Sequence, residues 1–102
     1  MSEQSSSRID HVEFHHTETP DGMSHLAARI DDKGNLRMEG QDIGRLVEKT
    51  WGQDEYEYAV TVDRLLKDTV LLNLLKERFK TTSEFMEWLK GKKLEYEFWS
   101  WP

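Results

Sequence analysis

The residues best suited to chemistry in this sequence lie in the stretch HVEFHH, at positions 11–16. Side chains in a β-strand alternate between its two faces, so a strand here places His11, Glu13 and His15 on one face. Residues two apart are separated by about 6.5–7 Å along a strand, which lets Glu13 and one neighbouring histidine share a metal ion. His11 and His15, about 13 Å apart, hardly can. The pattern therefore predicts a metal site built on Glu13 and one of these histidines.

Such a site needs further ligands from another strand. The acidic residues whose phase puts them on the same sheet face include Glu39 and Glu97. His16 falls on the opposite, apolar face beside Phe14, where we expect a residue of the sheet edge or the core instead of a ligand. The alternative for the whole stretch is a set of ordinary surface histidines on a polar strand.

Paired glutamates occur in two similar tetrapeptides, EYEY at 55–58 and EYEF at 95–98. Two carboxyl groups could serve as general acid and general base if a pocket raised the pKa of one of them. A flat sheet face in a chain of this size offers little pocket, and no G-x-S-x-G nucleophile motif accompanies the pairs. We expect the pairs to act as an acidic surface for a protein partner; they are Glu55, Glu57, Glu95 and Glu97.

The C-terminal stretch FWSWP carries two tryptophans, Trp99 and Trp101. Exposed tryptophan is enriched at the energetic centres of protein interfaces. The structural alternative is that Trp99 packs over a neighbouring strand and Trp101 fixes the chain end. We include both in the predicted partner-binding set with the four glutamates.

The elements that must position these residues follow from the apolar periodicity. Weak alternation, followed by the turn sequences TPDG at 19–22 and DDKG at 31–34, predicts three consecutive strands ending near Gly40. Further alternation predicts strands at 54–62 and 93–101, whereas helical spacing predicts helices near 43–51, 63–80 and 82–90. In the last helix, Thr81 and Glu84 form a capping-box pattern.

The repeated acid–aromatic pattern predicts that both strands bury their aromatics and expose their glutamates. The sequence thus predicts an α+β fold with an antiparallel or mixed sheet of about five strands, and two to three helices packed on one face. We expect residues 1–7, which are polar and rich in serine, to be a disordered tail, and residues 8–102 to form a single domain.

The chain has 102 residues, a net charge of −6 and no cysteine. This acidity argues against binding to nucleic-acid phosphates or anionic membranes, and the absence of cysteine excludes disulfides and thiolate metal sites. There is no secretory signal pattern and no apolar run long enough to span a membrane. GQDIG at 40–44 lacks the residues of a phosphate loop or dinucleotide fingerprint, so we predict no cofactor. We expect a cytoplasmic protein, whose oligomeric state the sequence leaves open.

Three functions compete on this basis. The first and favoured one is a small protein-interaction module, such as an inhibitor, immunity factor or adaptor, that binds a partner through its acidic face and terminal tryptophans. The second is a module that binds a small ligand or metal through His11, Glu13 and His15. The third is a small enzyme that uses the glutamates of the sheet face, for which the sequence offers composition alone.

Overall fold

The structure is a computed structural model that describes residues 9–44 and 54–102. These residues form two compact units. We call Asp10–Asp68 the sheet unit, and Thr69–Pro102 together with Ile9 the helical unit. The predicted tail at 1–7 lies outside the described residues, and the extent of a single domain from residue 8 stays a prediction.

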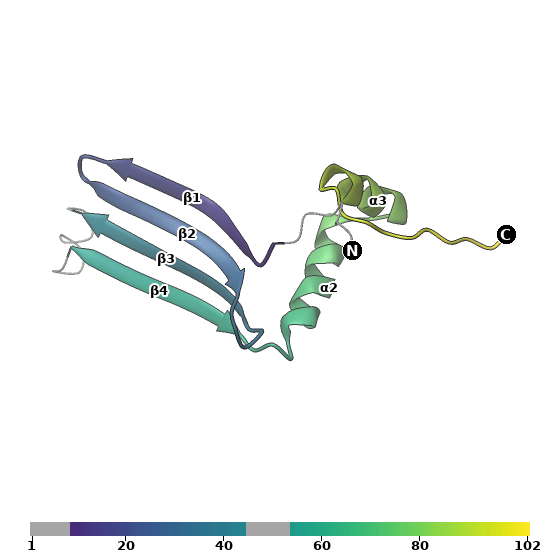
Figure 1. The fold of residues 1–102 in the computed structure, drawn as a ribbon, viewed down its shortest axis with the longest axis horizontal. Coiled ribbons are helices and arrows are strands. Elements are labelled where there is room, and N and C mark those ends of the chain that lie inside the picture. Colours follow the sequence, from purple (N-terminus) through teal and green to yellow (C-terminus); the bar gives the residue numbers. More distant parts are fainter. Residues whose placement is uncertain (1–8, 45–53) are drawn as a thin grey trace. The chain divides into compact units, whose positions relative to one another are not determined.

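The sheet unit contains an antiparallel sheet of four strands in the order β1-β2-β3-β4 (Figure 1). Each strand pairs with the next one along the chain, as in a meander. The α+β class and the antiparallel sheet are therefore confirmed. The strands are β1 (His11–Thr19), β2 (Gly22–Ile30), β3 (Leu36–Gly44) and β4 (Glu55–Val62).

Both predicted turns connect strands of this meander. In the turn after β2, the Asp31 side chain accepts hydrogen bonds from the backbone N–H groups of Lys33 and Asn35, at 2.9 and 2.8 Å. In the turn after β1, the Thr19 hydroxyl accepts a hydrogen bond from the backbone N–H of Asp21 at 3.2 Å. Short polar side chains thus hold the two turns in the way that their sequences indicate.

The third strand is longer than predicted. Residues 41–44 continue β3 and pair with both neighbouring strands, although their apolar spacing indicated the start of a helix. Strand pairing on both sides satisfies the backbone groups of this segment, which outweighs a weak helical pattern containing Gly44. The rest of the predicted helix, at 45–51, lies outside the described residues.

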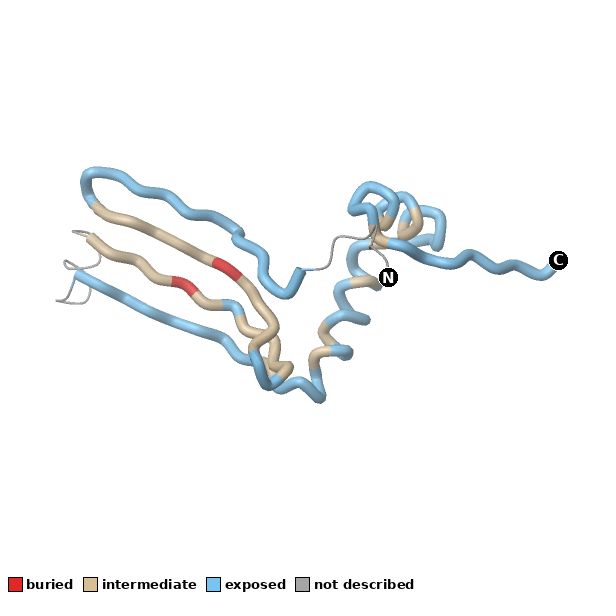
Figure 2. The backbone as a smooth tube through the Cα atoms, viewed as in Figure 1, coloured by how far each residue is buried: buried red, intermediate tan, exposed pale blue. Residues whose placement is uncertain are grey.

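The aromatic residues of β4 lie on the face that their alternation indicates. The Tyr58 ring lies over the Cα of Gly40 on β3 and stacks with Tyr56 at a centroid distance of 5.3 Å. The two tyrosines keep 38% and 36% of their surface exposed, and Val60 keeps 63%. Figure 2 shows how little of the described sheet is buried; Ala27, at 4% exposure, is its one buried side chain. That helices cover this face stays a prediction.

Two helices follow the sheet, α2 (Lys67–Arg78) and α3 (Thr82–Gly91). The Thr81 hydroxyl accepts a hydrogen bond from the backbone N–H of Glu84 at 3.1 Å, which confirms the predicted N-cap. The Glu84 carboxylate in turn accepts a hydrogen bond from the backbone N–H of Lys80, one residue earlier than a capping box requires. Among the described residues, no helix is long and apolar enough to cross a membrane.

The predicted fifth strand is absent from the described residues. The segment from Leu94 to Pro102 has no regular secondary structure, and it belongs to the helical unit. At the end of α3, Lys93 has a positive φ of 59°, and the backbone N–H of Leu94 bonds back to the carbonyl of Leu89 at 3.0 Å. The described residues therefore form four strands where about five were predicted, because alternation alone does not supply a partner edge.

Two glycines face each other where β2 begins and β3 ends. Gly22 pairs with Gly44, and both have positive φ, 151° and 138°. A Cβ on Gly22 would overlap the backbone carbonyl of Ile43, and one on Gly44 would overlap that of Asp21. The close approach of these two backbones therefore depends on glycine.

We expect Gly22→Ala to lower the free energy of unfolding by about 1–3 kcal/mol, because the obstacle is backbone and the φ is unfavourable for alanine. Urea denaturation followed by far-UV circular dichroism measures this change. Gly91→Ala is the control, since a Cβ there meets no atom within 4 Å and alanine favours the helix. Equal destabilisation by both substitutions would contradict the close approach.

Candidate functional site

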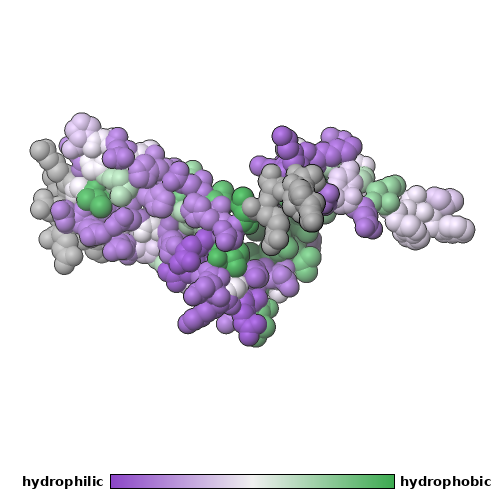
Figure 3. Space-filling model, in the orientation of Figure 1, coloured by the Kyte–Doolittle hydropathy of each residue, from purple (hydrophilic) through white to green (hydrophobic). Residues whose placement is uncertain are grey.

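The polar face of the sheet carries most of the residues that could do chemistry. Cross-strand partners share a face, so the pairing of Ala27 with Glu39, and of Glu39 with Ala59, defines it. Figure 3 shows that the visible face of the sheet is mainly hydrophilic. The polar face comprises His11, Glu13, His16, Glu18, Met23, His25, Ala27, Arg29, Arg37, Glu39, Gln41, Ile43, Glu55, Glu57, Ala59 and Thr61.

A β-bulge in β1 decides which histidines reach this face. Glu13 pairs with Ala27 and His15 pairs with Leu26, so Phe14 is an extra residue without a partner in β2. Such an insertion shifts the alternation of every residue that follows it in the strand. The residues after Phe14 therefore point to the opposite face from the one that simple alternation gives.

The predicted phases of His15 and His16 are consequently wrong. His15 lies on the face of Leu26, where its Nε2 is 3.2 Å from the Ser24 hydroxyl. His16 pairs with His25 and lies on the polar face. The structure thus separates His15 from Glu13 in the predicted metal set, while His11 keeps its predicted face opposite Arg29.

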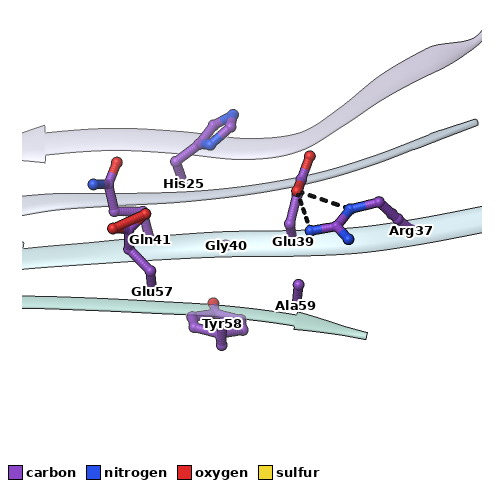
Figure 4. A pocket seen from close by; sticks show the side chains of 8 residues that line it. All are labelled: His25, Arg37, Glu39, Gly40, Gln41, Glu57, Tyr58 and Ala59. Atoms are coloured by element: carbon purple, nitrogen blue, oxygen red, sulfur yellow. Dashed lines mark hydrogen bonds and ion pairs between the residues drawn. The ribbon is translucent and has the colours of Figure 1, made fainter. Parts of the chain in front are cut away.

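An ion-pair network occupies the centre of the polar face. The Arg29 Nε donates to one oxygen of the Glu39 carboxylate at 2.6 Å. The Arg37 guanidinium donates to the other oxygen through Nε and Nη2, at 3.3 and 3.1 Å (Figure 4). Arg37 also donates to the Thr61 hydroxyl on β4 at 3.0 Å. Glu39 therefore joins two cationic side chains that face each other on β2 and β3.

These contacts change the electrostatics of Glu39. The hydrogen bonds from Arg29 and then from Arg37 lower the pKa of the Glu39 carboxyl from its ordinary value of 4.5, because they stabilise its charged form. The same contact with Glu39 raises the pKa of Arg29. A carboxyl group whose pKa is lowered is a poor general acid near neutral pH. Glu39 is therefore better suited to structure than to acid catalysis.

A shallow depression of about 410 Å³ lies beside this network. Figure 4 shows His25, Glu39 and Gln41 projecting to the same side of the sheet. Glu57 also lines the depression, from β4. Both signs of charge are present here, together with an imidazole, which suits a small polar ligand better than an apolar one.

The predicted partner-binding residues divide between the two units. Glu55 and Glu57 lie on the polar face, where Glu55 accepts a hydrogen bond from the Gln41 amide. Glu95, Glu97, Trp99 and Trp101 instead lie in the C-terminal segment of the helical unit, which we define as residues 94–102. The expectation that Glu95 and Glu97 lie on a strand of the sheet is therefore wrong.

The C-terminal segment displays its aromatic side chains to solvent. Trp99 is 81% exposed and Trp101 is 85% exposed. Phe98 is 65% exposed, although its phase indicated the buried face of a strand. Both tryptophans are thus exposed, as the interaction hypothesis requires, in an irregular segment of chain.

A feature of the helical unit that the sequence reasoning missed is an apolar groove of about 540 Å³ between α2 and α3. At one end, Phe79 packs against Phe85 and Trp88, with centroid distances of 5.3 and 5.9 Å. Leu71, Leu74 and Leu75 of α2 also line the groove, and the first two are more than half exposed. The signal was present as leucines around most of α2, a pattern typical of a helix with more than one apolar contact surface.

Acid should weaken the sheet unit through Glu39. Because the folded pKa lies below the ordinary value, this carboxylate stabilises the fold fully above pH 4.5 and progressively less as pH falls through the lowered value. The pKa of Asp31 is lowered too, mainly by the hydrogen bond from the Asn35 backbone, and acts in the same direction. We expect the urea midpoint of the protein to fall between about pH 5 and pH 3, and to fall less steeply in Glu39→Gln.

The matched control for that substitution is Glu57→Gln, which removes a carboxylate from the same face of the adjacent strand. It should retain the steep dependence on pH. If Glu39→Gln and the unsubstituted protein lost stability in parallel, the network would not supply the acid sensitivity.

Comparisons with known proteins found no match to this chain. No protein-family model matches the chain, and neither a curated protein nor a solved structure matches it. The function of the chain is therefore inferred from its own residues.

Proposed function

We propose that the chain is a protein-interaction module that binds a basic protein partner through its C-terminal segment. The observation that carries this proposal is the exposure of Phe98, Trp99 and Trp101 within a short stretch of irregular chain. Large exposed aromatics cost solubility unless they serve a contact, and tryptophan supplies more interface energy than most side chains.

The form of the segment suits recognition as an extended peptide. It has no helix or strand of its own in the structure, and an extended segment of this kind can add a strand to the edge of a partner's sheet. In such a complex, alternate side chains enter pockets on the partner. Trp99 and Trp101 are two residues apart and would therefore occupy neighbouring pockets on one side of the peptide.

The negative charge of the segment and of the whole chain indicates that the partner is basic. The segment contains Glu95 and Glu97 but no basic residue, and the whole chain carries a net charge of −6. A complementary partner presents lysine or arginine around apolar pockets. Such complementarity speeds association and makes the rate sensitive to salt.

Glu55 and Glu57 enter the proposal in a secondary role. They belong to the sheet unit and would add to the negative field that guides a basic partner toward the protein. Charges at the rim of an interface affect association rate more than they affect the lifetime of a complex. A cytoplasmic location stays a prediction, consistent with the absence of cysteine from the sequence.

The test uses the full chain as bait in a lysate of its host. We expect the double substitution Trp99→Ala and Trp101→Ala to lose a stoichiometric protein that the unsubstituted bait captures at low salt and releases at high salt. A synthetic peptide of residues 94–102 should displace that protein from the bait, whereas a scrambled peptide of the same composition should not.

Two controls separate loss of contact from loss of fold. Circular dichroism melting should be unchanged in the double variant, because both tryptophans are at least four-fifths exposed. Trp88→Ala removes a tryptophan that packs on Phe79 and should lower the stability of the bait. The peptide of residues 94–102 should still displace the partner from this variant. Equal capture by the double variant and the unsubstituted bait would refute the proposed surface.

A further inference from the structure

Three side chains with metal-ligand chemistry converge on the polar face of the sheet. Glu13 and His16 come from β1, and His25 comes from β2. One ligand atom from each lies within 4.8 Å of the corresponding atoms of the other two. The β-bulge at Phe14 makes this possible. It puts Glu13 and His16, which are three positions apart, on the same face of the sheet, where they follow one another along β1.

The individual distances are close to those of a coordinated ion. Two ligand atoms bound to zinc at about 2.0–2.1 Å in tetrahedral geometry are separated by about 3.3 Å. His25 Nε2 and Glu13 Oε1 are 3.4 Å apart. The rings of His16 and His25 meet edge to face, with centroids 5.6 Å apart, so small side-chain rotations would aim a nitrogen of each at a shared point.

We propose that Glu13, His16 and His25 bind one divalent transition-metal ion of the class that prefers imidazole and carboxylate ligands, such as Zn²⁺ or Ni²⁺. Two imidazoles and one carboxylate are a common donor set for such ions, and they leave coordination positions open to water or a further ligand. This proposal is independent of the function proposed for the C-terminal segment, which lies in the other unit.

The surroundings favour a cation. Glu18, on the same strand and face, has its Oε2 3.1 Å from His16 Nε2 and adds a second carboxylate beside the cluster. Arg29, a cation on the same face, is engaged with Glu39. The three side chains are between about a third and a half exposed, so an ion can enter from solvent without opening the fold. This exposure predicts a moderate affinity, weaker than that of a buried structural site.

A purely structural reading also exists and makes a different prediction. Glu13 and His25 would form an ordinary surface ion pair when the imidazole is protonated. The ion pair predicts no saturable metal binding, whereas a metal site predicts binding that depends on both histidines of the cluster.

The experiment is isothermal titration calorimetry of the full chain, without a polyhistidine tag and freed of metal by chelation, with ZnCl₂ and separately with NiCl₂. We expect one saturable site per chain. His16→Ala and His25→Ala should each weaken binding about ten-fold or more, since loss of even an indirect supporting contact costs that much at many metal sites.

His15→Ala and His11→Ala are the matched controls, because the chain offers the same side chain one position away on the opposite face and again at the start of β1. Both should bind metal as the unsubstituted protein does, and melting curves in chelator should show all four variants folded. Absence of saturable binding at about millimolar metal would overturn the proposal. An equal loss on His15→Ala and His16→Ala would overturn it as well, because it would show binding by histidines in general instead of by this cluster.

Discussion

Backbone pairing between strands is the constraint on which the polar face depends. Ala27 is the one buried side chain among the described residues of the sheet, so side-chain burial supplies little of the order seen there. The hydrogen-bonded ladder instead decides which residues are neighbours, as in the row that joins Ala27 to Glu39 and Ala59. The ion-pair network of Glu39 follows from that row, because Arg29 and Arg37 are direct partners two positions along the ladder, on the same face. A change in register would therefore disturb every polar contact of the face together.

Much of this arrangement can be predicted from the sequence, and the predictions that failed have a common physical cause. The turns, the tyrosine face of β4 and the N-cap at Thr81 depend on local chemistry, and the structure confirms them. The misplaced features are the extension of β3, the phase of His15 and the missing strand near the C-terminus. Each depends on which other strand is available for pairing, and a single strand's sequence does not record that. The convergence of Glu13 with His25 could not be predicted for the same reason, because His25 comes from β2.

The two similar tetrapeptides illustrate the limit most directly. EYEY, at 55–58, forms part of β4 because β3 offers it a complete antiparallel edge. EYEF, at 95–98, has the same alternation of acid and aromatic, yet the structure gives it no strand, and the residues that follow it are exposed. Alternation therefore describes a segment that is able to form a strand, and the fold decides whether it does. The proposed interaction surface and the failed strand prediction involve the same residues, because the alternation that suits a strand also suits an extended peptide bound at the edge of a partner's sheet.

The extra residue in β1 decides which face of the sheet each later residue of the strand occupies. Every position between Phe14 and the turn at Pro20 lies on the opposite face from the one that simple alternation assigns to it. The polar face therefore carries His16 in place of His15. The chemistry of either face of the sheet therefore depends on whether the strand contains the bulge, as well as on which residues the strand contains. The same sequence paired without the bulge would keep its composition and display His15 and Thr17 where this chain displays His16 and Glu18. Alignment with a relative that lacks the bulge should therefore follow strand pairing, because residue-by-residue identity would equate side chains that lie on opposite faces of the sheet.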